Sequence, residues 1–126
     1  MSKEYTASDD LLLRLCLGIL IGCAQAESCI YYGTLSRQLG RRHKSVEVCV
    51  AELCEIQRRI TLWCKARQMP NLAILIIHDK TVNATLPDPS VWPELGLDNL
   101  PLAKVISQAH LQVQAVKRYW SADLNV

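Results

Sequence analysis

The chain has 126 residues, of which half are hydrophobic and 21% are charged, and its formal net charge is +2 at pH 7. This length and composition are typical of one globular domain, spanning residues 1–126, and they exclude a disordered tail. The positive charge is concentrated. Residues 37–68 contain eight Lys or Arg and three Glu, whereas the rest contains six basic and nine acidic residues. Such asymmetry either orients the molecule towards a polyanion or marks the solvated face of a long helix.

The six cysteines all lie in the first half of the sequence. They form no CxxC pair, and the three histidines have no zinc-finger spacing. Most of the cysteines fall on apolar helical positions, where a free thiol behaves as a small hydrophobe. We therefore expect reduced thiols in a cytoplasmic protein, with no disulfide framework, no metal site and no cofactor.

An apolar segment predicts the first helix, over residues 10–27. Its sequence "LLLRLCLGILIGC" resembles an export signal, but the residues before it are acidic and Arg14 interrupts an apolar run too short to span a bilayer. The segment is apolar almost all round, so we expect other helices or a second subunit to cover it. Gly18 and Gly22 share one face, where a partner helix can approach closely.

Two further helices are predicted, joined by a polar corner. The first spans residues 34–39 and is closed by Gly40 in the usual C-terminal role, and the second begins at Ser45 and ends near Arg67. Apolar residues recur along the second helix at intervals of three and four, as an amphipathic helix requires. These apolar residues are Val46, Cys49, Leu53, Ile56, Ile60 and Trp63.

The second half of the chain predicts a small sheet and a final helix. The uncharged run "LAILIIH", residues 72–78, is typical of a buried strand, and its nearest candidate partner is a weak strand at 81–85. A proline-rich connection over residues 86–101 leads to a helix over 102–120. The predicted fold class is α-rich α+β: a winged-helix-like helix-turn-helix with a long third helix, a small sheet and a C-terminal helix.

The corner meets the demands of a helix-turn-helix. Ser36 is a small residue in its first helix, Leu39 and Gly40 close that helix, and Val46 is apolar early in the second. Basic side chains ahead of a helix N-terminus can hold phosphates, and its first turn can face bases. We predict a nucleic-acid-binding surface in which Arg37, Arg41, Arg42, His43 and Lys44 are phosphate donors and Ser45, Glu47 and Val48 face the bases. Glu47 can accept from cytosine N4, although it repels phosphate.

A family resemblance supports the fold. The segment "IYYGTLSRQLG" resembles the "tYGeLAxxLG" segment of winged-helix domains, including the DNA-binding half of alkyltransferase-like proteins. From Tyr31 to about Trp120 the chain is similar to small bacterial and phage proteins in which a long helix, a "glPpL" turn, an apolar strand and a C-terminal helix follow that segment. Here residues 69–72 match the turn. The alkyltransferase cysteine and proline are absent, and residues 86–89 replace the glycine-rich turn that follows the strand.

No catalytic motif is complete. His78 and Asp79 end the predicted strand, but neighbouring strand residues point to opposite faces, so we expect a polar strand end rather than a catalytic pair. Cys29 would be a reactive thiol only if nearby arginines lowered its pKa. We predict that the protein is not an enzyme.

Two functions remain open. The first is a small DNA-binding protein, homodimeric and cytoplasmic, that binds double-stranded DNA and either regulates transcription or accompanies a mobile element. The alternative is a protein-interaction module, such as a phage-encoded inhibitor or adaptor, which contacts a protein partner through the first helix and the segment around Trp92. Neither function involves a membrane.

Overall fold

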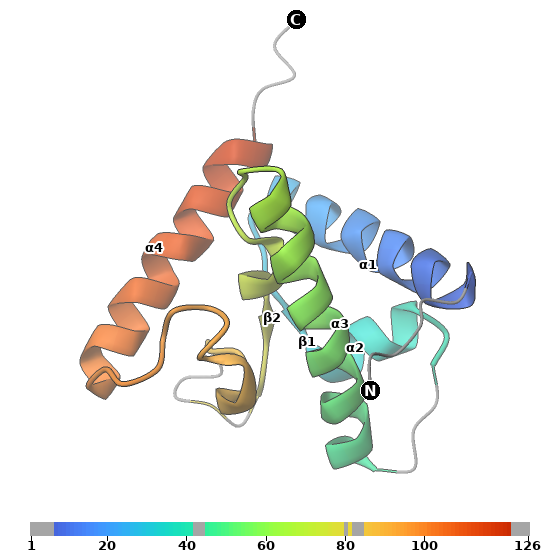
Figure 1. Cartoon of the computed structure of the whole chain (residues 1–126), viewed down its shortest axis with the longest axis horizontal. Coiled ribbons are helices and arrows are strands. Elements are labelled where there is room, and N and C mark those ends of the chain that lie inside the picture. Colours follow the sequence, from blue (N-terminus) through green and yellow to red (C-terminus); the bar gives the residue numbers. More distant parts are fainter. Residues whose placement is uncertain (1–6, 42–44, 80, 82–84, 122–126) are drawn as a thin grey trace, which may run out of the picture.

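The computed structural model describes residues 7–41, 45–79, 81 and 85–121. Its bulk consists of three long helices and one short helix, in the predicted order (Figure 1). They are α1 (Ala7–Gln25), α2 (Tyr32–Gln38), α3 (Val46–Ala66) and α4 (Leu102–Trp120). The α-rich class is therefore confirmed. The predicted start of the short helix at residue 34 is wrong, because α2 begins at Tyr32.

A small parallel sheet lies at the centre of the molecule, and here the predicted strand is mostly wrong. Residues Leu72–Leu75 form a 3₁₀ helix, η1, and only Ile76–Ile77 form strand β2. The side chain of Asn71 accepts a hydrogen bond from the Ala73 amide at 3.0 Å and so starts the helical turn. A short apolar run does not distinguish a buried strand from a buried helical turn by its pattern.

The strand that pairs with β2 comes from an unexpected part of the chain. It is β1 (Ile30–Tyr31), which runs parallel to β2 with Ile30 opposite Ile76. Of the predicted partner at 81–85, residues 82–84 lie outside the described residues. Directly after that segment, Leu86 forms an isolated antiparallel bridge with His78.

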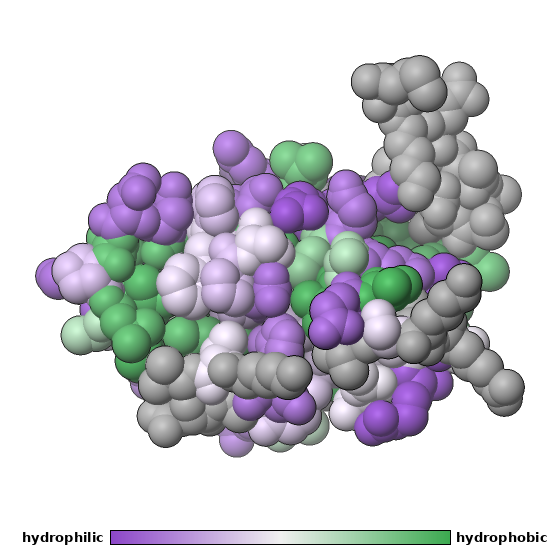
Figure 2. Space-filling view, turned by 90° about the horizontal axis from the view of Figure 1, so that it is seen from below, coloured by the Kyte–Doolittle hydropathy of each residue, from purple (hydrophilic) through white to green (hydrophobic). Residues whose placement is uncertain are grey.

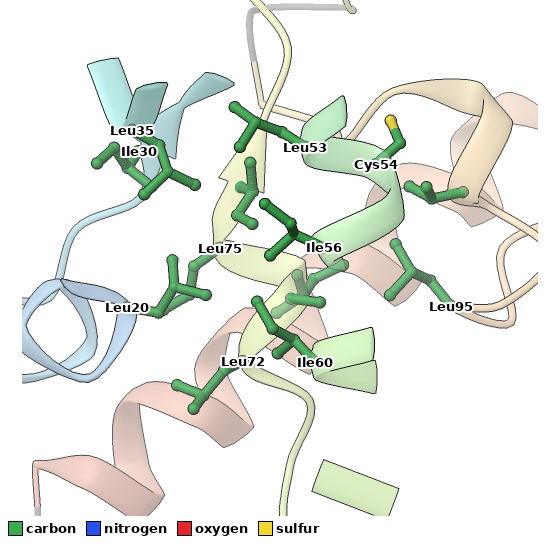
Figure 3. Packing of buried hydrophobic residues seen from close by; sticks show 14 of the residues in the cluster. Leu20, Ile30, Leu35, Leu53, Cys54, Ile56, Ile60, Leu72, Leu75 and Leu95 are labelled. Atoms are coloured by element: carbon green, nitrogen blue, oxygen red, sulfur yellow. The ribbon is translucent and has the colours of Figure 1, made fainter. Parts of the chain in front are cut away.

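The hydrophobic core is built around η1, all four residues of which are 0% exposed. Figure 3 shows η1 between α1 on one side and α3 on the other, with α4 below. Each of these helices contributes side chains that are also 0% exposed, among them Leu20 from α1, Ile60 from α3 and Val116 from α4. Because every long helix packs on η1, this short segment fixes how the helices are arranged.

The ends of α2 and α3 follow the predicted chemistry. Gly40 has φ +72°, a left-handed conformation that favours glycine, and it follows the last turn of α2. Ser45 caps α3, since its Oγ accepts a hydrogen bond from the Val48 amide at 3.2 Å. The prediction that the long helix begins at the serine is confirmed.

A buried amide joins the elements around η1. Gln57 of α3 is 0% exposed, and its Nε2 donates to the carbonyl oxygens of Ala73, at 2.7 Å, and Ile76, at 3.2 Å. Its Oε1 accepts from the Tyr32 hydroxyl at 2.5 Å, and that hydroxyl accepts from the Asp88 amide at 3.1 Å. Burial raises the pKa of Tyr32 well above its usual value, so the phenol stays protonated and can donate.

One face of α1 is not covered. Leu11 and Leu15 are 57% and 50% exposed, and nothing lies within 4 Å of where a Cβ would stand on Gly18 or Gly22. The partner helix expected against the two glycines is therefore not supplied by the described residues.

In the described part of the chain, no helix combines the length and apolar character needed to cross a bilayer.

We predict that Gln57→Leu lowers the free energy of unfolding by about 3 kcal/mol, because it leaves two buried carbonyls and the Tyr32 hydroxyl without their partner. Urea denaturation measures this loss. Gln108→Leu makes the same change at an exposed position of α4 and should alter stability by less than about 0.5 kcal/mol. Equal stability of Gln57→Leu and the wild type would show that the amide network contributes little.

Candidate nucleic-acid interface

The corner between α2 and α3 is closely packed. Ser36 of α2 is 4% exposed, which confirms a small buried residue in the first helix of the corner. The Arg41 amide donates to the Ser36 carbonyl at 2.9 Å, and the Cys49 thiol of α3 approaches the Tyr32 carbonyl at 4.0 Å. The first contact closes the end of α2, and the second holds the beginning of α3 against α2.

The described residues of the predicted surface all face solvent. They are Arg37, Arg41, Ser45, Glu47 and Val48. The other three predicted residues, Arg42, His43 and Lys44, lie outside the described residues. Val48 is 48% exposed although it is apolar, so the first turn of α3 presents a mixed polar and apolar face.

The two described arginines of the corner differ in their partners. Arg41 forms an ion pair with Glu52 of α3, and the two side chains are 45% and 29% exposed. Arg37 donates from Nη2 to Thr34 Oγ1 at 3.3 Å, and among the described residues no carboxylate lies within ion-pair distance of it. Arg37 is therefore the cation better placed to meet an anion, whereas Arg41 must first leave its carboxylate.

Two further cations of residues 37–68, Arg58 and Arg67, do not extend this surface. Arg58 pairs with Glu94 at 2.9 Å, and the Arg67 guanidinium lies 4.0 Å from the ring centroid of Trp63. Both lie farther along α3, away from its first turn. The local charge excess in the sequence is thus distributed along the helix, and within the described part of the corner Glu47 and Glu52 match Arg37 and Arg41 in number.

An open groove of about 840 Å³ lies beside the corner, between α2, the first turns of α3 and the end of β2. We call it the corner groove. Its lining includes Tyr31, Thr34, Arg37, Arg41, Ser45 and His78. The groove therefore combines two arginines with hydroxyl groups and an aromatic ring, and it shares three residues with the predicted surface.

His78 borders the same groove and contacts two carboxylates. His78 Nδ1 lies 3.2 Å from Asp79 Oδ1, and its Nε2 lies 3.8 Å from Asp88 Oδ1. The expectation that His78 and Asp79 point to opposite faces of a strand is wrong, because β2 ends at Ile77 and the chain turns at Asp79. The His78 ring also packs edge-on against Tyr32, with centroids 5.8 Å apart. These contacts hold the imidazole in place at the end of the sheet.

Beside the histidine lies a thiol, but its environment does not activate it. The Ser90 hydroxyl donates to Cys54 Sγ at 3.5 Å, and Sγ lies 3.9 Å from the Tyr32 hydroxyl. Burial raises the pKa of Cys54, against the opposing effect of these hydrogen bonds, so the thiol stays neutral at pH 7. A neutral thiol is a poor nucleophile.

The buried network was not predicted from the sequence, although one signal was present. Gln57 lies four residues after Leu53 and seven after Val50, and it is therefore a polar residue in the middle of the apolar stripe of α3. A glutamine at a core position indicates buried hydrogen bonds. No comparable signal pointed to the contact between His78 and Asp88. The fold brings these two residues together because His78 forms a bridge with Leu86, two residues before Asp88.

The cysteines within the described residues are all free thiols. The condition for a reactive Cys29 is not met, because burial raises the pKa of this thiol and the opposing charge is that of Lys117. In the parts of the chain that the structure describes, no group of His, Cys, Asp or Glu side chains is arranged to hold a metal ion.

The thiol of Cys16 makes stability depend on alkaline pH. Burial raises its pKa from 9.0 to about 12, so unfolding lets it ionise. The stability that the neutral thiol contributes is present below pH 9 and is lost as the pH rises, by about 1 kcal/mol near pH 10. In urea denaturation, Cys16→Ala should therefore lose less stability between pH 8 and 10 than the wild type. Val50→Ala, a core change without a thiol, should keep the full dependence, and equal dependence in Cys16→Ala would contradict the assignment.

Known proteins give no further information on the corner, the groove or the buried network. The sequence was compared with protein-family models and with curated proteins, and solved structures were searched as well. None of the three comparisons finds a match.

Proposed function

We propose that the protein is a small DNA-binding protein of the winged helix-turn-helix kind, which acts as a homodimer on double-stranded DNA in transcription regulation or in a mobile element. The observation that carries the proposal is the α2–α3 corner, where α3 packs across the buried Ser36 and turns its exposed first turn outwards.

The chemistry of the corner assigns different roles to its side chains. Arg37 donates to a phosphate directly, since it has no carboxylate to leave among the described residues. Arg41 exchanges Glu52 for a phosphate, which is possible because a partly exposed ion pair contributes at most about 1 kcal/mol. Glu47 faces the bases and accepts from a cytosine amino group, which gives a preference for cytosine at that position.

Two substitutions should change DNA affinity in opposite directions. Arg37→Gln removes a phosphate contact, so we expect weaker binding and a slope of log K against log salt that is shallower by about one. Glu52→Gln releases Arg41, so we expect tighter binding and a steeper slope. Fluorescence anisotropy with a labelled duplex at several salt concentrations measures both.

Arg118→Gln is the matched control, because it removes the same charge from the exposed last turn of α4. It should leave the slope unchanged. Absence of duplex binding by the wild type at low salt would overturn the proposal, and so would equal loss of affinity in Arg37→Gln and Arg118→Gln.

The exposed face of α1 favours a second candidate, a protein-interaction module that acts without nucleic acid. Leu11 and Leu15 continue into Gly18 and Gly22 along one face, and all four are exposed. A water-facing helix surface is normally polar, whereas these four positions carry no polar side chain over several turns, with the exposed Arg14 at their edge. A second apolar area lies where α4 begins: Leu100 and Leu102 are exposed there, and hydrophobic residues gather at the corresponding left end of Figure 2.

We predict that the double variant Leu11→Gln/Leu15→Gln removes association through α1. Sedimentation should show wild-type particles larger than 14.2 kDa and a monomeric variant. If the wild type is monomeric, its apolar face should bind the dye ANS more strongly than the variant does. Leu62→Gln, at an isolated leucine of α3 that is 67% exposed, should leave both results unchanged. A monomeric wild type with unaltered dye binding in the double variant would exclude this candidate.

A further inference from the structure

The corner groove has the dimensions of a small-molecule site. Its volume of about 840 Å³ lies within the range of roughly 300–1,000 Å³ that is usual for ligand pockets. It is bounded by segments far apart in sequence: β1 and α2, the first turns of α3, and the end of β2 at His78. These segments pack on one another, since α2 contacts β1, β2 and α3, and the Tyr32–Gln57 hydrogen bond joins α2 to α3.

The groove has a polar part suited to an anion. Arg37 has no carboxylate partner in the described chain, and its Nη2 donates a hydrogen bond to Thr34. Ser45 uses its oxygen to accept from the Val48 amide, which leaves its hydroxyl hydrogen available to a ligand. The acidic group in the lining, Asp79, contacts His78 instead of either arginine. A guanidinium with nearby hydroxyl groups is the usual recognition set for a phosphate.

Another part of the groove is suited to a planar ring. Tyr31 is 43% exposed and lines the groove, so an aromatic face is available to a ligand. Cys49 and Val50 are buried and form an apolar floor nearby. Any nucleobase can stack on an exposed aromatic side chain, because every base has a π-face.

We propose that the corner groove binds a nucleoside monophosphate, with the phosphate on Arg37 and Ser45 and the base against Tyr31. This site does not depend on duplex binding. It nevertheless shares Arg37, Arg41 and Ser45 with the proposed DNA surface, so the nucleotide and the duplex compete. The small molecule would therefore act as a negative effector of DNA binding.

Isothermal titration calorimetry of the full chain with AMP tests the proposal. We expect saturable binding of one AMP per chain and weaker binding of adenosine or inorganic phosphate alone. Arg37→Gln and Tyr31→Ala should each raise the Kd by about tenfold or more. Arg118→Gln and Tyr119→Ala are the matched controls, because both residues are exposed on α4, and they should bind AMP as the wild type does.

Three results would overturn the proposal: no saturable binding at about 5 mM AMP, unchanged binding in both groove variants, or equal affinity for AMP and inorganic phosphate. Circular dichroism of each variant checks that it is folded.

The duplex assay separates this proposal from the proposed function. Tyr31→Ala should weaken AMP binding and leave the salt slope of duplex binding intact. A wild type that does not bind AMP but binds the duplex would overturn this proposal and leave the proposed function standing.

Discussion

The rest of the structure depends on the burial of an irregular backbone segment. The chain passes through the core as a 3₁₀ turn followed by a two-residue strand, and such a segment carries carbonyl groups that need partners away from water. Gln57 supplies donors for two of them, at Ala73 and Ile76, and its own acceptor is used by Tyr32. A single amide thereby joins α3 to η1, β2 and α2, and satisfied polar groups in a core specify one arrangement.

This arrangement determines where the corner and the groove lie. Tyr32 is the first residue of α2 and Gln57 lies in the middle of α3, so their hydrogen bond fixes the two helices relative to each other. The Tyr32 hydroxyl also accepts from Asp88, which brings the proline-rich connection against the same network. Consequently the exposed first turn of α3, the arginines and the end of β2 stand together as one surface.

Charge limits what this surface can do. Glu52 holds Arg41 and Glu47 occupies the first turn of α3, so the corner has no strong positive field in its described part. Recognition of an anion there depends on local geometry around Arg37 more than on long-range attraction, which is screened beyond about 8 Å at physiological salt. The apolar face of α1 belongs to a different helix and contributes no residue to the groove lining. The two candidate functions therefore rest on different surfaces.

The sequence by itself determined the helices, because their signals are local. Apolar periodicity placed α3 and α4, Ser45 marked a cap, and Gly40 marked a left-handed end, each within a few residues of the structure. Of the corner residues that the sequence singled out, the described ones are exposed: Arg37, Arg41, Ser45, Glu47 and Val48. Only the tertiary structure decided that residues 72–75 are helical, that β2 pairs with Ile30–Tyr31, and that Glu52 neutralises Arg41. The reason is physical: strand pairing, buried hydrogen bonds and ion pairs join residues distant in sequence, and periodicity reports only which face of a segment is buried.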